Sequence, residues 1–371
     1  YREQVRRSAL VLQGLTYQPS GAVVAAATTS LPEAIGGSRN WDYRFSWLRD
    51  ASLVLRALWV GACPDEPERL FAWIDRTGSG AVNHEVQIMY GVEGERDLTE
   101  HVLENLAGFE HSRPVRIGND AWKQRQLDVH GDVLDAAYLF RDRFPDTGGM
   151  LRTLLVSLAD QAAANWKRPD RGMWELRDRE RHYLSSKLMC WVALVRAVSL
   201  APELGVSRDH GSRWAKARDE IRHAIIAEGW SGKAGAYTGS FGSETLDASV
   251  LLMPIVGFLP AEDARMKATI EAIDSRLGHN GLIRRWPQEE GAFVLCSYWM
   301  AECLALAGEF GRAAERFDAI TSYANDLGLL SEEIDPETGA MLGNFPQAFS
   351  HIGLVNTAWL LTTRAAGSRH H

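Results

Sequence analysis

The chain has 371 residues and a formal net charge of -8, with 46% hydrophobic and 24% charged residues. This composition is typical of a globular protein with a substantial core, and it excludes a disordered or fibrous chain. The negative charge provides no overall positive field that would hold nucleic acid or an anionic membrane, so a small neutral molecule is favoured as the partner.

The four cysteines are few for this length, and three of them lie inside apolar runs: Cys190, Cys296 and Cys303. They are predicted to be buried free thiols. The cysteines and histidines lack the spacing of metal ligands, so we expect no metal site, no disulfide framework and no cofactor. The longest apolar stretches are too short to cross a bilayer. A cytoplasmic location is the expectation, and secretion stays open because Tyr1 is not an initiator methionine.

Apolar residues recur at helical spacing in twelve segments, and sustained strand alternation is almost absent. In the second segment, for example, Ala51, Leu55 and Leu58 recur on one face. The predicted helices are 2–15, 46–61, 65–76, 129–142, 149–166, 185–200, 208–227, 245–257, 261–277, 293–308, 310–324 and 350–366. The sequence therefore predicts an all-α protein.

Short turns that contain Gly or Pro, such as 257–260 and 308–311, join several of these segments into helical hairpins. Twelve helices in hairpins predict a closed double ring. Six polar stretches are too long to be simple connectors in a compact domain: 16–45, 77–128, 167–184, 228–244, 278–292 and 325–349. Because long and short connections alternate, one end of the ring is predicted to carry the function.

Three of the long stretches contain distinctive motifs. Residues 37–50 read GSRNWDYRFSWLRD, residues 173–177 read MWELR, and LSEEID at 330–335 is followed by GNFPQAFSH at 343–351. In order and spacing these motifs closely resemble glycoside hydrolase family 15, the glucoamylases and trehalases. Further matching segments extend the resemblance over nearly the whole chain.

The resemblance implies an (α/α)6 barrel and hydrolysis of a terminal α-glucose with inversion at its anomeric carbon. By family position, Glu175 is the general acid and Glu332 is the general base. An inverting glycosidase needs two such carboxyls, because one protonates the leaving oxygen while the other deprotonates water on the opposite face of the sugar. Their separation of roughly 6.5–9.5 Å leaves room for that water.

The surroundings of the two glutamates are expected to differ. Glu175 lies among Met173, Trp174 and Leu176, which would desolvate its carboxyl and favour the protonated form that an acid needs. Glu332 must be ionised, so we expect it in a wetter, hydrogen-bonded setting. Glu333 competes for the role of base, since the residues alone do not show which of the two faces the cleft.

The motifs also contain candidate sugar-binding residues. Arg49 and Asp50 resemble the family's pair that holds the terminal glucose, whereas in isolation they would be interpreted as a helix cap with an ion pair. Aromatic rings can stack on sugar C–H faces, although most tryptophans of helical proteins serve packing. The candidate set is Tyr43, Trp47, Arg49, Asp50, Trp122, Trp174, Arg177 and Glu290. Lys187 and His351 lie in matching segments as pocket or supporting residues.

Three functions remain. The 31–37 and 344–351 segments favour an α,α-trehalase, and the alternative is a glucoamylase-like enzyme that releases glucose from malto-oligosaccharides. A non-catalytic sugar-binding protein is a more remote hypothesis, because both catalytic glutamates are present. We expect residues 1–366 to form one catalytic domain and 367–371 to be an expression-tag remnant. The N-terminal β-sandwich domain of relatives is not recognisable here, and the sequence is compatible with a homo-oligomer.

Overall fold

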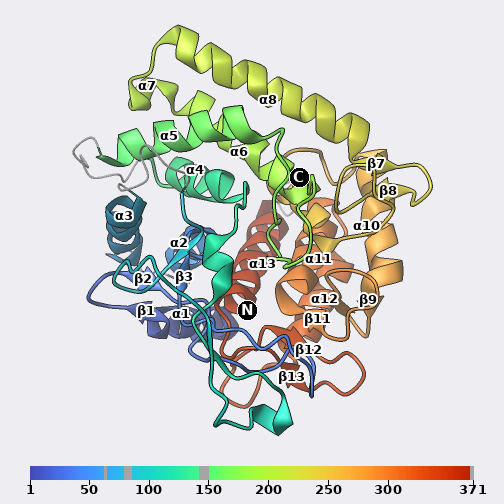
Figure 1. The fold of residues 1–371 in the computed structure, drawn as a ribbon. Coiled ribbons are helices and arrows are strands. Elements are labelled where there is room, and N and C mark those ends of the chain that lie inside the picture. The colour runs from blue at the N-terminus through green and yellow to red at the C-terminus, as the bar shows by residue number, and fades with distance from the viewer. Residues whose placement is uncertain (62–64, 79–85, 142–149, 368–371) are drawn as a thin grey trace.

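The computed structural model describes residues 1–61, 65–78, 86–141 and 150–367 (Figure 1). Helices dominate, as the apolar periodicity predicts. They are α1 (Arg2–Gly14), α2 (Leu48–Val60), α3 (Asp65–Gly78), α4 (Val129–Leu139), α5 (Met150–Asn165), α6 (Leu184–Ser199), α7 (Ala201–Leu204), α8 (Arg208–Glu228), α9 (Leu252–Ile255), α10 (Ala264–Leu277), α11 (Val294–Leu306), α12 (Phe310–Thr321) and α13 (Ala348–Gly367). The described residues also form the short 3-10 helices η2 (Phe109–His111), η3 (Asp120–Lys123) and η5 (Ala248–Leu251).

The helices form two concentric rings. In the inner ring, α2 packs on α4, α4 on α6, α6 on η5, and α9 on α11. Helix α11 then packs on α13, and α13 packs on α2 and closes the ring. The outer ring consists of α1, α3, α5, α8, α10 and α12, each of which packs against the inner helices. The prediction of an (α/α)6 barrel is therefore confirmed (Figure 1).

Hydropathy explains which helices lie inside. Every residue of α11 except Leu306 is buried, and this helix is apolar on all sides, as expected for an element packed all round. In contrast, α8 buries only Trp214, Ile221 and Ile225 along 21 residues, and it lies along the edge of the molecule in Figure 1. None of the helices in the described ranges combines the length and the apolar composition that crossing a membrane would require.

The predicted segments match these helices closely, with one exception. Segment 245–257 is not one continuous helix but the 3-10 turn η5 followed by the four-residue α9. The side chain of Asp247 accepts a hydrogen bond from the Ser249 amide and so starts the turn, and Gly257 with a φ of 79° follows α9. The short helix α7 was not predicted. Residues 368–371 of the predicted tag lie outside the described residues.

Besides the 3-10 helices η2 and η3, the described parts of the long loops contain antiparallel strands of two residues each. They pair as β1 (Thr16–Tyr17) with β2 (Ala22–Val23), β3 (Ser46–Trp47) with β4 (Met89–Tyr90), β5 (His101–Val102) with β6 (Arg116–Ile117), β7 (Trp230–Ser231) with β8 (Ala236–Tyr237), and β9 (Gly278–His279) with β10 (Leu282–Ile283). A three-stranded sheet joins β11 (Ala292–Phe293), β12 (Glu333–Ile334) and β13 (Met341–Leu342), with Phe293 opposite Glu333.

Each long loop leads from an outer element to the next inner helix. The loops thus precede α2, α4, α6, η5, α11 and α13, and the hairpin connections that return to the outer ring are short. All six long loops therefore gather over the N-terminal ends of the inner helices. This arrangement explains why motifs that are distant in the sequence meet at one end of the barrel.

Candidate active site

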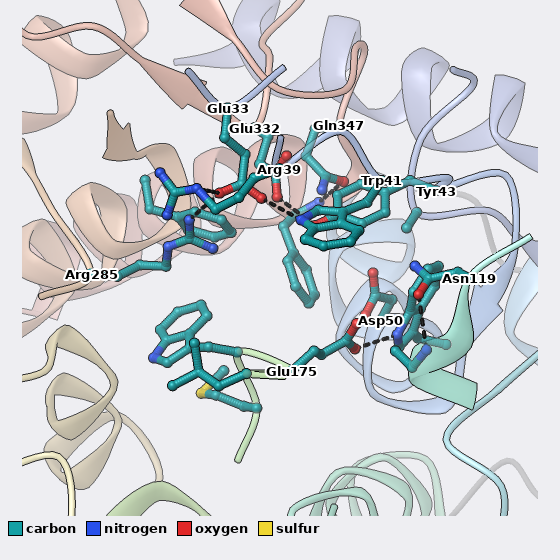
Figure 2. Close-up of a pocket in the computed structure, with 18 of the residues that line it drawn as sticks. Glu33, Arg39, Trp41, Tyr43, Asp50, Asn119, Glu175, Arg285, Glu332 and Gln347 are labelled. Atoms are coloured by element: carbon teal, nitrogen blue, oxygen red, sulfur yellow. Dashed lines mark hydrogen bonds and ion pairs between the residues drawn. The ribbon is translucent and has the colours of Figure 1, made fainter. Parts of the chain in front are cut away.

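A pocket of about 260 Å³ lies among the long loops (Figure 2). This volume is small for a ligand site, since pockets for drug-sized molecules measure about 300–1,000 Å³. Five of the six long loops contribute to it. The lining residues are Ala25, Glu33, Arg39, Trp41, Tyr43, Trp47, Arg49, Asp50, Asn119, Ala121, Met173, Trp174, Glu175, Leu176, Arg177, Arg285, Trp286, Phe293, Glu332, Gln347 and Phe349.

Glu175 enters the pocket from the loop that precedes α6. Its φ of 59° lies in the left-handed region, which non-glycine residues rarely occupy and which is often found at functional sites. Trp47 Nε1 donates a hydrogen bond to Glu175 Oε1 at 2.5 Å, and Arg49 Nη2 donates to the same oxygen at 3.2 Å. Burial raises the pKa of Glu175, although Arg49 and Trp47 counteract it. The expected desolvation of this carboxyl is confirmed.

Glu332 lies in the loop that precedes α13, and only 2% of it is exposed. The Tyr43 hydroxyl donates a hydrogen bond to Glu332 Oε1 at 2.8 Å. Glu332 Oε2 lies against Gly343 and has no hydrogen-bond partner among the described residues. Burial, and then the negative charge of Glu33, raise the pKa of Glu332 to about 8. The expected hydrogen bond is present, but the expectation of a wet setting is wrong, because the loop and Tyr43 cover the carboxyl.

Glu333 points into a buried ionic cluster around Arg285 and not into the pocket lining. Arg285 Nη2 lies 2.5 Å from Glu333 Oε1 and 2.7 Å from Glu33 Oε2, and its Nε lies 2.7 Å from Glu289 Oε1. These three carboxylates are close enough together to hold a metal ion, but the guanidinium already pairs with each of them. The geometry thus separates the two adjacent glutamates: Glu332 faces the pocket and Glu333 holds Arg285.

Arg49 and Asp50 form a polar floor at the N-terminus of α2. Arg49 Nη1 donates hydrogen bonds to Gln126 Oε1 and Asp128 Oδ2, each at 2.9 Å, so the guanidinium is fixed in place. Burial raises the pKa of Asp50 to about 7, although Arg49 opposes this shift. Asp50 Oδ1 has no hydrogen-bond partner within the described ranges. A fixed guanidinium beside an unsatisfied carboxyl oxygen suits the hydroxyl groups of a sugar.

Trp174 forms an aromatic side of the pocket. Its Nε1 donates to Asp247 Oδ1 at 3.0 Å, and its ring packs edge-on against Phe293 with 5.2 Å between centroids. Trp286 lies next to it, 6.4 Å away between centroids. These contacts fix the orientation of an apolar surface that can pack against the C–H face of a sugar ring.

The structure brings most of the predicted site residues together. The pocket contains Tyr43, Trp47, Arg49, Asp50, Trp174, Glu175, Arg177 and Glu332. Trp122 and Glu290 do not line it. Trp122 packs against the core under Lys123, whose Nζ lies 5.4 Å from the ring centroid. Glu290 is exposed, whereas the neighbouring Glu289 is buried against Arg285.

Several polar pocket residues were missing from the prediction: Glu33, Arg39, Asn119, Arg285 and Gln347. Arg39 and Gln347 lie inside the recognised motifs, so the motifs themselves were a usable signal. The four-residue spacing of Arg285 and Glu289 was another, because it matches a local ion pair. Glu33 lies in the 31–37 segment that favours a trehalase, so this segment was a usable signal as well, although its partner Arg285 is 252 positions away.

Lys187 and His351 support the site from outside the pocket. Lys187 Nζ donates to the Arg168 carbonyl at 2.5 Å. His351 is fully buried; its Nε2 accepts the Leu330 amide at 3.2 Å and its Nδ1 lies 2.9 Å from Ser8 Oγ. Burial lowers the pKa of His351 to about 3, so the ring is neutral and anchors the loop that carries Glu332.

Comparisons with solved structures agree with the barrel. The chain superposes on a structure titled "Glycosidase Wild Type" with a TM-score of 0.78 at 21% identity, covering 97% of this chain and 96% of that one. It also superposes on a bacterial glucoamylase complexed with acarbose, with a TM-score of 0.74 at 14% identity, covering 96% of this chain and 55% of that one. At these identities the likeness concerns the fold.

The sequence comparisons find relatives with a higher identity to this chain. A trehalase of Mycolicibacterium smegmatis is 44% identical, and the match covers 96% of this chain and 55% of the relative. Trehalases of Mycobacterium tuberculosis and Thermoplasma volcanium are 43% and 37% identical, each over 96% of this chain and over 54% and 58% of the relative. The chain thus spans little more than half the length of these relatives. The family model described as "Glycosyl hydrolases family 15" matches residues 1–315 and 309–359, and the chain belongs to this family.

Proposed function

We propose that this chain hydrolyses α,α-trehalose to two glucose molecules with inversion at one anomeric carbon. The observation that carries the proposal is the placement of two carboxyls, Glu175 and Glu332, on different sides of one small pocket (Figure 2). Arg49 and Asp50 form the buried floor of this pocket. Carboxyls on two sides of a bound sugar are what an inverting glycosidase requires.

In this proposal Glu175 is the general acid. Burial favours its protonated form, and Trp47 and Arg49 hold Oε1 in a fixed orientation. The carboxyl donates its proton to the glycosidic oxygen as the bond to the anomeric carbon breaks. Once the proton has left, the carboxylate remains beside the Arg49 guanidinium, which stabilises the new negative charge.

Glu332 is the general base in the same proposal. It removes a proton from a water molecule that attacks the anomeric carbon from the face opposite the departing sugar. Tyr43 donates to Glu332 Oε1, which orients the carboxylate and favours its charged form. The terminal glucose occupies the floor, where Arg49 and Asp50 bind its hydroxyl groups.

Two observations support trehalose over a glucan. The pocket of about 260 Å³ suits a small substrate, and relatives that are 34–44% identical over most of this chain are named trehalases. The second candidate is a glucoamylase-like hydrolase that acts on malto-oligosaccharides. It is favoured by the likeness of the fold to a glucoamylase, and it would use the same two carboxyls.

We also infer that residues 1–366 act as one catalytic domain. The inner ring of helices closes on itself between α13 and α2, and α1 packs on both of these helices. The pocket is lined by residues from 25 to 349, which supports one domain over this range.

The test is to incubate the protein with trehalose, maltose or maltotriose and to follow the product anomers by NMR. Inverting hydrolysis of trehalose yields one α- and one β-glucose at early times, before mutarotation. Glucose from the malto-oligosaccharides alone would replace the trehalase proposal by the second candidate. No turnover of any of the three would leave a sugar-binding role as the function.

A further inference from the structure

Three loops that are separate in the sequence meet around Trp41 at one side of the pocket. The Arg177 guanidinium, from the loop of Glu175, lies 4.1 Å from the centroid of the Trp41 ring. The Arg116 guanidinium, from the β5–β6 hairpin, lies 4.6 Å from the same centroid. Trp41 Nε1 donates to Glu33 Oε1 at 2.9 Å, so the ring is also fixed in its own plane.

Glu100 ties the two guanidiniums together. Its Oε2 accepts from Arg177 Nη2 at 2.6 Å, and its Oε1 accepts from Arg116 Nε at 2.7 Å. Arg116 Nη1 in turn donates to the carbonyls of Ser38 and Asn40, each at 3.0 Å. Although burial alone would raise it, the pKa of Glu100 is lowered by Arg177 and Arg116. Glu100 itself does not line the pocket.

The position of this cluster in the pocket shows which part of a substrate it meets. Arg49 and Asp50 at the floor are 4% and 3% exposed, whereas the Arg177 side chain is 39% exposed, so Arg177 lies toward the mouth. A terminal sugar that is held at the floor directs its leaving group toward the mouth. Trp41, whose ring contacts the Arg177 guanidinium, lines the same pocket (Figure 2).

We propose that Trp41 and Arg177, held together by Glu100 and Arg116, form a fixed wall that admits one sugar beyond the cleaved bond and excludes a third. This inference rests on the proposed function, because it specifies the length of the substrate that the same site accepts. Two cation–π contacts and a shared carboxylate keep the wall in place without blocking the floor.

The test uses trehalose and a trisaccharide in which one ring of trehalose carries an extra α-1,4-linked glucose. Attack on the α,α-1,1 bond from the unsubstituted end releases maltose as the leaving group, which needs room for a third sugar. Attack at the other end would release glucose and leave trehalose. The maltose product therefore reports on the wall, while both substrates share the linkage that is cleaved.

The variant is Glu100→Ala, which frees Arg177 without altering a pocket residue, and the matched control is Glu104→Ala in the same hairpin, where the side chain is exposed. The wild-type protein is expected to cleave trehalose and to release little maltose. Glu100→Ala should raise the ratio of kcat/KM for maltose release to kcat/KM for trehalose by about ten-fold or more, the scale of discrimination by fit in a pocket. Glu104→Ala should leave the ratio unchanged.

The two proposals fail in different ways. If the wild-type protein cleaves trehalose but releases maltose from the trisaccharide just as efficiently, no wall operates. An unchanged ratio in Glu100→Ala, with trehalose activity retained, would likewise overturn the wall alone. If the protein does not cleave trehalose, the proposed function is wrong, and the proposal of the wall, which rests on it, is wrong as well.

Discussion

Glu332 and Glu333 are adjacent in the chain, yet their carboxyl groups lie in different environments. Glu332 lines the pocket and accepts a hydrogen bond from the Tyr43 hydroxyl, whereas Glu333, the first residue of strand β12, pairs with Arg285 at 2.5 Å. Glu332 directly precedes β12, and its backbone continues the pairing of the strand, because its amide donates to the Asn344 carbonyl and its carbonyl accepts the Val294 amide. Successive side chains of such extended backbone point to opposite faces, which separates the two carboxyl groups. This relationship leads directly to a test of the proposed base.

Glu332→Gln should lower kcat by about 10²–10⁴, the range typical of lost general acid–base catalysis. Glu333→Gln is expected to retain most of the activity but to lower the free energy of unfolding by about 1–3 kcal/mol, because it removes one charge from the buried Arg285 cluster. Steady-state rates and thermal unfolding of both variants check this. A severe loss of kcat in Glu333→Gln with a mild one in Glu332→Gln would exchange the two roles.

Tyr43→Phe should move the acidic limb of the pH profile. The Tyr43 hydroxyl stabilises the ionised form of Glu332 and therefore lowers its pKa. Without this donor the pKa rises further, so less base is ionised at a given pH and the acidic limb of kcat/KM shifts to higher pH. On that limb kcat/KM should fall by about ten-fold, as expected for a hydrogen bond to a charged group.

The same profile in the wild-type protein provides the reference. Burial raises the pKa of Glu332 to about 8. The acidic limb of the wild-type kcat/KM profile is therefore expected at a pH well above 4.5, the ordinary pKa of a glutamate. A Tyr43→Phe profile that shifts to lower pH, or that does not move, would show that this hydroxyl does not control the ionisation of the base.

Glu33→Gln should shift the limb in the opposite direction. After burial, the negative charge of Glu33 is the largest cause of the raised pKa of Glu332. Glutamine removes the charge and keeps an oxygen that can accept the Trp41 Nε1 hydrogen bond. The pKa of Glu332 should fall, so that activity extends to lower pH. The measurement is again kcat/KM against pH, and thermal unfolding shows whether the Arg285 cluster tolerates the change.

The opposite signs of these two shifts make the pair informative. A general loosening of the pocket would displace both profiles in one direction or only reduce the rate. If the acidic limb shifts upward in Tyr43→Phe and downward in Glu33→Gln, both residues act on the ionisation of the same carboxyl, that of Glu332. If Glu33→Gln shifts the limb upward, the charge of Glu33 is not what raises the pKa of Glu332.

Much of the fold was predictable because apolar periodicity is a local property of the chain. Helices such as α12 and α2 carry their apolar pattern in their own residues, and the predicted spans match them within a few residues. Segment 245–257 misled the prediction, because a run of apolar residues was taken for one helix although Asp247 and Gly257 fix a short turn there. The alternation of long and short connections correctly placed the long loops at one end of the barrel, where the pocket lies.

The site was predictable only where a motif identified it. Arg285 pairs with Glu33, 252 positions away, and with Glu333, 48 positions away, and such pairs leave no periodic trace in the sequence. The choice of Glu290 over Glu289 shows the same limit, because the loop backbone decides which of two adjacent carboxylates is buried. Burial of Glu332 was also missed, since it results from Tyr43, which comes from another loop, and from Gly343, which the β12–β13 pairing brings back against it.

Gly343 provides a test of how precisely the base is held. A Cβ at this position would lie 2.4 Å from Glu332 Oε2, closer than any real contact. Gly343→Ala should therefore displace the Glu332 carboxyl and reduce kcat by about ten-fold or more, since small misplacements of catalytic groups are costly. KM should change less, because Arg49 and Asp50 still hold the terminal sugar at the floor.

Gly339→Ala is the matched control. Gly343 and Gly339 have φ values of 73° and 75°, so alanine meets the same backbone strain of about 1 kcal/mol at both. At Gly339 the nearest atom to the new Cβ is Tyr323 Cε1 at 3.5 Å, an ordinary contact, and neither residue lines the pocket. The two variants should unfold at similar temperatures and differ in kcat. Equal loss of kcat in both would mean that loop strain, and not contact with Glu332, limits the rate.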